Sequence, residues 1–118
     1  MRNEYIFNLG PFYHVPVGKG LLIMVNGREL AVFRNEYDEI FIMENYVSSG
    51  EGSLHQGSVE GTVFTAPASR FRFDLMDGEG LDNRHFLTLL PSWVEEGIVF
   101  MRYPTLVFSS RNIQSVLN

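Results

Sequence analysis

The fold class of this chain is decided by the stretch Leu21-Leu22-Ile23-Met24-Val25-Asn26-Gly27-Arg28-Glu29-Leu30-Ala31-Val32-Phe33-Arg34. Two apolar runs flank the dipeptide Asn26-Gly27. Both central positions of a two-residue hairpin turn need a positive φ, which asparagine and glycine adopt at low cost. Two apolar runs with Asn-Gly between them are the strongest short sequence pattern for a β-hairpin. The stretch therefore predicts two antiparallel strands, over 21–25 and 29–34.

The rest of the chain continues as short apolar runs separated by turns. A polar turn at 35–39 leads to an expected strand at 40–43, and the glycine- and serine-rich segment 48–61 is interpreted as two loops on either side of Leu54. Further strands are expected at 62–65, 71–75, 86–90, 93–94 and 98–103, with turns at 77–78 and 95–97. Helical spacing of apolar residues is not sustained before residue 105. This pattern predicts an all-β fold, a small antiparallel barrel or sandwich. Residues 109–118 could form one short helix or a frayed tail.

Composition excludes several classes of protein. The chain has 118 residues, no cysteine and a formal net charge of −5. The lack of cysteine removes disulfides, cysteine nucleophiles and thiolate-held metal clusters. With one lysine and eight arginines, a basic surface for nucleic acid is not expected. No apolar run is long enough to span a membrane, and the first ten residues contain no secretory signal, which favours a cytoplasmic protein.

The segment that follows the expected strand at 62–65 carries a family resemblance. It reads Ala66-Pro67-Ala68-Ser69-Arg70-Phe71-Arg72-Phe73-Asp74 and resembles the second cluster box of Rieske [2Fe–2S] domains, Cys-Pro-x-His-Gly-Trp-x-Phe-Asp. Pro67, Phe73 and Asp74 match, and Phe71 replaces the tryptophan. The first box, Cys-x-His-x-Gly-x-x-Leu, is matched at its end by Leu54. The resemblance covers roughly residues 21–101.

All four cluster ligands are replaced in this alignment. Val47 and Ala66 stand at the two cysteines, and Ser49 and Ser69 stand at the two histidines. A Rieske centre needs two thiolates on one iron and two imidazoles on the other. The resemblance therefore implies a Rieske-like scaffold that binds no cluster, and no cofactor or metal is expected. The only imidazoles, His14, His55 and His85, have no metal-ligand spacing and are interpreted as solvated loop residues.

The resemblance also implies a domain layout. The whole chain, 1–118, is expected to form one Rieske-like (ISP) domain with its base sheet at about 1–45 and 75–103. A smaller subdomain at about 46–74 would form the vacated cluster tip, and 104–118 would be a C-terminal extension. Phe33, Phe41, Phe73 and Trp93 are expected to be largely buried, because they lie in alternating or continuous apolar runs.

The ligand-free members of the family suggest a function. Arg72-Phe73-Asp74-Leu75-Met76-Asp77-Gly78 looks like the strand after the second box in the cluster-free small subunit of NADH-dependent nitrite reductase. That resemblance implies a cytoplasmic accessory subunit, not catalytic by itself, whose partner is the large subunit of an oxidoreductase. Two alternatives stay open. One is a stand-alone interaction module in another oxygenase or biosynthetic system, and the other is an enzyme or small-molecule binder that uses the vacated tip as a pocket.

Two arginines are candidates for contact with such a partner. Arg70 and Arg72 alternate with Phe71 and Phe73, so a continuous strand would place both arginines on one face. We expect them to be either a solvated strand face or a docking surface beside the tip. No catalytic residue is predicted, because neither Ser49 nor Ser69 has the sequence surroundings of an activated nucleophile.

Overall fold

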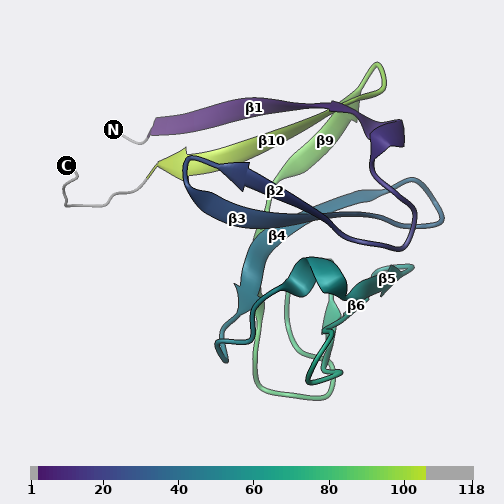
Figure 1. The fold of residues 1–118 in the computed structure, drawn as a ribbon, viewed down its shortest axis with the longest axis vertical. Coiled ribbons are helices and arrows are strands. Elements are labelled where there is room, and N and C mark those ends of the chain that lie inside the picture. The colour runs from purple at the N-terminus through teal and green to yellow at the C-terminus, as the bar shows by residue number, and fades with distance from the viewer. Residues whose placement is uncertain (1–2, 106–118) are drawn as a thin grey trace.

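The computed structural model describes residues 3–105, and these residues form three β-sheets (Figure 1). Sheet A has the order β1 (Asn3–Pro11), β10 (Ile98–Thr105) and β9 (Ser92–Glu95). Sheet B has the order β2 (Leu21–Val25), β3 (Arg28–Arg34), β4 (Ile40–Val47) and β8 (Leu87–Leu90). Sheet C has the order β5 (Ser58–Glu60), β6 (Val63–Thr65) and β7 (Arg72–Asp74).

The pairing confirms the predicted all-β, antiparallel fold. All seven ladders between these strands are antiparallel. Two short 3₁₀ turns, η1 (Phe12–His14) and η2 (Leu54–Gln56), interrupt the strands. Among residues 3–105, no helix has the length and hydropathy that a membrane-spanning segment needs. The possible helix at 109–118 lies outside the described residues.

The predicted hairpin is confirmed in register. Asn26 has φ 51° and Gly27 has φ 79°, so both turn residues adopt the left-handed conformation that the Asn-Gly sequence predicts. Val25 lies opposite Arg28 and Leu21 lies opposite Val32. The turn therefore fixes which residues of β2 and β3 share a face of the sheet.

The two central strands of sheet B, β3 and β4, are covered on both faces by two separate cores. Leu30 and Val32 of β3 pack with Val99 and Met101 of sheet A. The alternate residues, Ala31 and Phe33, pack with core residues of sheet C. Because β3 is covered on both sides, its sequence is a continuous apolar run rather than an alternating one. Figure 1 shows sheet C below sheet B and sheet A above it.

The structure differs from the sequence-based expectations at three strands. β1 was not predicted, β5 lies in the segment expected to be two loops, and β4 continues to Val47 instead of ending at residue 43. Phe33 and Phe73 are buried as expected. Phe41 and Trp93 are partly buried, and Phe41 packs against the core between sheets B and C. Trp93 stacks on Phe100 with ring centroids 5.9 Å apart and an interplanar angle of 18°.

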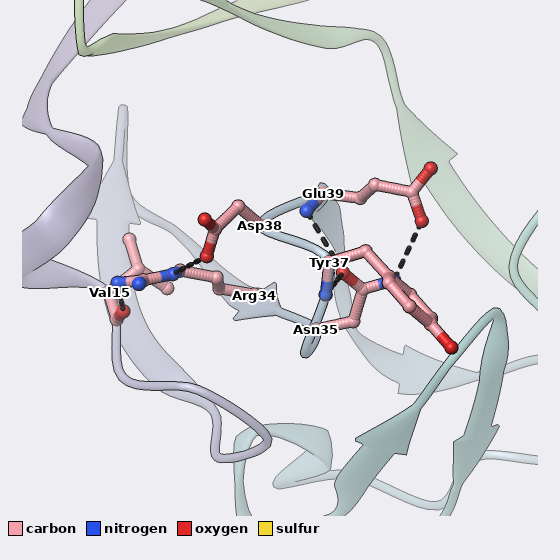
Figure 2. Close-up of polar contacts among 6 residues, drawn as sticks. All are labelled: Val15, Arg34, Asn35, Tyr37, Asp38 and Glu39. Carbon is pink, nitrogen blue, oxygen red and sulfur yellow. Dashed lines mark hydrogen bonds and ion pairs between the residues drawn. The ribbon is translucent and has the colours of Figure 1, made fainter.

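The turn between β3 and β4 is organised by a buried amide (Figure 2). The Asn35 Oδ1 accepts hydrogen bonds from the backbone N–H groups of Tyr37 and Glu39, both at 2.9 Å. The Asn35 Nδ2 donates to the Glu39 carboxylate at 2.7 Å and to the carbonyl of Gly61 at 2.9 Å. Gly61 lies between β5 and β6, so this one side chain joins sheet B to sheet C.

Candidate functional site

Three loops lie around the residues expected at the vacated cluster site, and we call them the first (residues 47–53), second (66–70) and third (81–86) tip loops. The first loop begins where β4 ends. The Val47 N–H donates to the carbonyl of Glu51 at 2.8 Å, and the Gly50 N–H donates to the carbonyl of Val47 at 2.8 Å. The Val47 side chain is 1% exposed and belongs to the core between sheets B and C.

The second tip loop closes on itself in the same way. The Ala66 N–H donates to the carbonyl of Phe71 at 2.9 Å, and the Ala66 side chain is fully buried in the same core as Val47. The Ser69 hydroxyl accepts a hydrogen bond from the Phe71 N–H at 3.1 Å. The loop is therefore held by its own backbone and by packing of its first residue.

A carboxylate from the first tip loop joins the two loops. The Glu51 Oε2 accepts hydrogen bonds from the backbone N–H groups of Ala68 at 2.8 Å and Ser69 at 3.2 Å. The Glu51 Oε1 is buried as well, and within the described residues it has no hydrogen-bond partner. Burial by itself would raise the pKa of Glu51, but the nearby Ser69 hydroxyl and the hydrogen bonds from the Ala68 and Ser69 N–H groups lower it below its usual value.

Sequence reasoning missed Glu51. Counting along the first box from Val47 puts Glu51 at its glycine, and an acidic residue at that position is the one signal that could have identified it. Its role depends on how closely the first and second loops approach, which the sequence does not show.

The residues at the four ligand positions do not fit an iron–sulfur cluster. Val47 and Ala66 offer no donor atom and fill the core. Ser49 and Ser69 are exposed, and their hydroxyls accept hydrogen bonds from nearby backbone N–H groups, Glu51 at 3.4 Å and Phe71 at 3.1 Å. A Rieske centre requires thiolates and imidazoles, so this donor set cannot replace them.

The third tip loop lies against the first. The Ser48 N–H donates to the carbonyl of Phe86 at 3.1 Å, and the Phe86 N–H donates to the Ser48 hydroxyl at 3.0 Å. Next to Phe86, the ring of His85 stacks on the ring of Phe71, with the two ring centroids 5.7 Å apart. This contact links the third tip loop to the residue that follows the second tip loop. Phe86 itself is 54% exposed, so the tip presents an aromatic side chain to solvent.

The two arginine candidates are exposed, but they do not share a strand. Arg72 lies in β7, and its Nε binds the Asp82 carboxylate at 3.1 Å. Hydrogen bonds from the Asn83 side chain, the Arg72 N–H and the Arg72 guanidinium lower the pKa of Asp82 to about 2. Arg70 has φ 65° and lies in a turn before β7, so the predicted strand alternation does not reach it. Arg70 is therefore part of the tip, whereas Arg72 is held in an ion pair beside it.

The expected histidines lie in separate places. His14 is in η1, His55 is in η2 and bonds to Asn45, and His85 stacks on Phe71. Within residues 3–105, no three His, Cys, Asp or Glu side chains are grouped as a metal site would require.

A second polar cluster lies at the hairpin end of the sandwich, between sheets A and B. The Tyr103 hydroxyl donates to the buried Glu44 carboxylate at 2.7 Å, and Arg28 binds the same carboxylate at 3.1 Å. Burial and the hydrogen bond to Glu44 raise the pKa of Tyr103. Beside this cluster is an open groove of about 520 Å³, lined by Gly27, Arg28, Glu29, Glu44, Asn45, Tyr46, Gly52 and Ser53. Glu44 is contacted by Tyr103 of sheet A and by Arg28 of sheet B, so we interpret this cluster as a polar contact that joins the two sheets.

No protein-family model matches this chain. Over 69 residues, 58% of its length, the chain is 33% identical to the ferredoxin component of a naphthalene 1,2-dioxygenase system from Pseudomonas aeruginosa. That match covers 65% of the relative, and the chain spans less than two thirds of the length of the curated relatives it matches.

Solved structures are similar over most of the chain. The small subunit assigned to an NADH-dependent nitrite reductase of Mycobacterium tuberculosis superposes with a TM-score of 0.77 at 19% identity, covering 88% of this chain and 99% of that one. A chain from the complex of reduced oxygenase and oxidized ferredoxin in carbazole 1,9a-dioxygenase superposes with a TM-score of 0.70 at 22% identity, covering 84% and 94%. The chain therefore has the predicted Rieske-type, ferredoxin-like fold, similar to that of nitrite reductase small subunits.

Proposed function

We propose that this chain is a cluster-free accessory subunit of a cytoplasmic oxidoreductase, comparable to a nitrite reductase small subunit, and that it acts by docking to a larger partner. The observation that carries the proposal is the structure of the tip. The two cysteine positions are core aliphatics, and Glu51 joins the first and second loops by hydrogen bonds from Ala68 and Ser69. The tip can therefore keep a defined shape without a cluster, and a defined surface is what a docking subunit needs.

The composition of the tip supports protein contact. Ser49, Ser69 and Arg70 are exposed on the first two loops, and Phe86 is exposed on the third. Arginine and aromatic side chains are enriched among the residues that dominate binding at protein interfaces. Small polar residues around them allow close approach. We expect the partner surface to be acidic opposite Arg70 and apolar opposite Phe86.

A second candidate function is a stand-alone interaction module in an aromatic-ring oxygenase system. The match to the ferredoxin component of a naphthalene 1,2-dioxygenase system favours it, because that is the similarity seen in the sequence itself. The third hypothesis, a small-molecule pocket at the vacated tip, is not favoured by the cavities of the structure. The nearby cleft of about 230 Å³ is lined by Glu79, Gly80 and residues 83–86 and does not include the ligand positions.

The partner can be identified by affinity capture from the native cell, with the soluble fraction tested first because the proposed location is cytoplasmic. Recovery of a nitrite reductase large subunit supports the first function, and recovery of an oxygenase component supports the second. If the captured preparation contains no oxidoreductase component, both are wrong.

The docking surface is tested by Arg70→Glu in the full chain. A charge reversal at an interface rim slows association and changes its salt dependence, so we expect the association rate with the captured partner to fall about tenfold at low salt. Lys19→Glu, the same charge change outside the three tip loops, is the control and should leave the rate unchanged. Equal association rates and affinities for wild type and Arg70→Glu would show that the tip is not the interface.

A further inference from the structure

The second tip loop binds a carboxylate through its backbone. The N–H groups of Ala68 and Ser69, consecutive residues of this loop, both donate to the Glu51 Oε2, at 2.8 Å and 3.2 Å. Consecutive backbone N–H groups that point toward one atom form a concave anion-binding site, known as a nest. We call these two N–H groups the tip nest. Its occupant in the free chain is a carboxylate of the chain itself.

An arginine without an ion-pair partner lies next to the tip nest. Arg70 follows Ser69 directly, is exposed, and forms no ion pair with any residue of the range 3–105. Arg72, by contrast, is paired with Asp82. A guanidinium group presents its N–H donors in a planar fork that matches a carboxylate. Arg70 therefore adds a positive charge beside the nest, available to an anion that binds there.

Glu51 is an incomplete ligand for the tip nest. Its Oε2 accepts both hydrogen bonds, whereas its Oε1 is buried and has no hydrogen-bond partner within the described residues. A buried acceptor without a donor costs free energy, because it has lost its water and gained no other hydrogen bond. A carboxylate from another molecule could place its second oxygen on Arg70 or in solvent and avoid this cost. The occupied nest is therefore open to exchange.

Release of the Glu51 carboxylate does not require the first tip loop to unfold. The backbone of Glu51 is held separately, because its carbonyl accepts a hydrogen bond from the Val47 N–H at 2.8 Å. The two hydrogen bonds with the nest are made by the side chain. Rotation between staggered side-chain conformers is enough to break them. Glu51 can therefore leave the nest while the loop keeps its backbone hydrogen bonds.

We propose that the tip nest is the site at which the docking partner inserts a carboxylate, from an aspartate or glutamate side chain, which displaces Glu51 from the N–H groups of Ala68 and Ser69 and pairs with Arg70. This inference rests on the proposed docking function and specifies its chemistry. In the free chain Glu51 is an internal competitor. The apparent affinity for the partner is then reduced to the extent that Glu51 fills the nest.

The sign of one substitution separates this competition from a purely structural role of Glu51. If Glu51 only kept the tip in shape, Glu51→Gln would loosen the docking surface and weaken partner binding. If Glu51 competes with the partner, the neutral side chain holds the nest less strongly, because hydrogen bonds to an ionised acceptor are the stronger ones. The affinity for an external carboxylate should then rise, by about fivefold.

The site is tested first without a partner, with sodium acetate as the carboxylate probe and amide NMR spectra of the full chain as the readout. Sodium chloride at equal ionic strength is the reference. Acetate should shift the Ala68 and Ser69 signals of Glu51→Gln with a dissociation constant on the order of 10 mM, and those of wild type about fivefold more weakly. Glu60→Gln, the same substitution at an exposed carboxylate of β5, should behave like wild type.

Two results of the acetate experiment would overturn the proposal. One is that acetate and chloride shift the Ala68 and Ser69 signals of Glu51→Gln equally. The other is that wild type and Glu51→Gln bind acetate with equal affinity. Unchanged amide signals in sheets A and B show that Glu51→Gln is folded. If it is not folded, the wild-type chain at the highest acetate concentration decides, because its Ala68 and Ser69 signals must still shift more than in chloride.

Binding to the captured partner is the second test. Glu51→Gln should bind the partner about fivefold more tightly than wild type, and Glu60→Gln should bind it equally. Unchanged or weaker binding by Glu51→Gln would show that the partner does not exchange with Glu51. The acetate experiment uses the free chain alone, so its result stands even if no oxidoreductase partner is captured. Failure of the nest and failure of the docking function are therefore distinguishable.

Discussion

At the scale of single residues, the Glu51 carboxylate links the first tip loop to the second. A bridging cluster would hold the first and second tip loops together through covalent bonds. Here the Glu51 carboxylate accepts two backbone hydrogen bonds from the second loop. Hydrogen bonds to an ionised acceptor are stronger than neutral ones, although solvent access reduces the gain. The link is reversible and depends on the charge of one side chain.

This link predicts a pH-dependent contribution to stability. The pKa of Glu51 is lowered in the folded chain from its ordinary value of 4.5, so its stabilisation is present above that pH and is lost as the pH falls through the folded pKa. Glu51→Gln should lower the free energy of unfolding by about 1 kcal/mol at neutral pH, and the difference from wild type should vanish in acid. Urea unfolding at several pH values measures it.

Glu60→Gln is the control for this experiment. Glu60 is an exposed carboxylate on β5, so its replacement should leave the free energy of unfolding unchanged at neutral pH. Other carboxylates titrate equally in wild type and in Glu51→Gln and cancel in the difference. If Glu51→Gln is as stable as wild type at neutral pH, the carboxylate does not hold the loops together.

The sequence predicts which cluster ligands are absent, but it does not predict which side chain links the two loops. The prediction that Val47, Ser49, Ala66 and Ser69 stand at the ligand positions comes from counting along the chain from the motif residues that match. The role of Glu51 cannot be predicted in this way, because it depends on a contact between loops 17 residues apart in sequence. The strand alternation of Arg70 with Arg72 failed for a local reason, the left-handed turn at Arg70.

At the scale of elements, Asn35 is the residue on which two sheets depend. It is fully buried, and its amide makes hydrogen bonds to two backbone N–H groups of the turn after β3 and to the carbonyl of Gly61, between strands β5 and β6 of sheet C. Asn35→Ala leaves these buried groups without partners, so the free energy of unfolding should fall by about 3 kcal/mol. Asn8→Ala removes one exposed side-chain bond, to the Gly10 N–H, and is the control, with an expected loss of about 0.5 kcal/mol.

Chemical denaturation of both variants measures the effect of the Asn35 amide. A loss of less than about 1 kcal/mol in Asn35→Ala would mean that water or a rearranged turn satisfies the same groups. In that case sheets B and C would be held together by their shared apolar core, without a contribution from the Asn35 amide.

The elements that the sequence predicts are those with local signals. The hairpin at 21–34 is confirmed in type and register, because Asn26-Gly27 determines its turn. β1 is not predicted from the sequence, because it pairs with β10 through residues far apart in sequence, such as Tyr5 with Tyr103. β5 is not predicted either, because it has three residues and a single buried apolar side chain, Val59, among glycines and serines.

At the scale of the whole molecule, sheet B is the element that lies between the two hydrophobic cores. Its two faces pack against sheet A and sheet C through separate buried clusters. Val47 and Ala66, which the family resemblance aligns with the two cysteines, belong to the second of these clusters, so apolar packing holds this region together. Burial of apolar surface on both faces of a central sheet is the main driving force for a domain of this size.

The same arrangement predicts that the folded protein binds no iron. Val47 and Ala66 are core aliphatics, and Ser49 and Ser69 supply neutral hydroxyls, so anaerobic reconstitution with iron and sulfide should leave the protein colourless and without stoichiometric iron. Iron analysis and visible absorbance measure this, with a cluster-carrying Rieske ferredoxin reconstituted alongside as the positive control. Visible absorbance with about two irons per chain would show that other side chains supply the ligands, and the docking role would then have to be reconsidered as electron transfer.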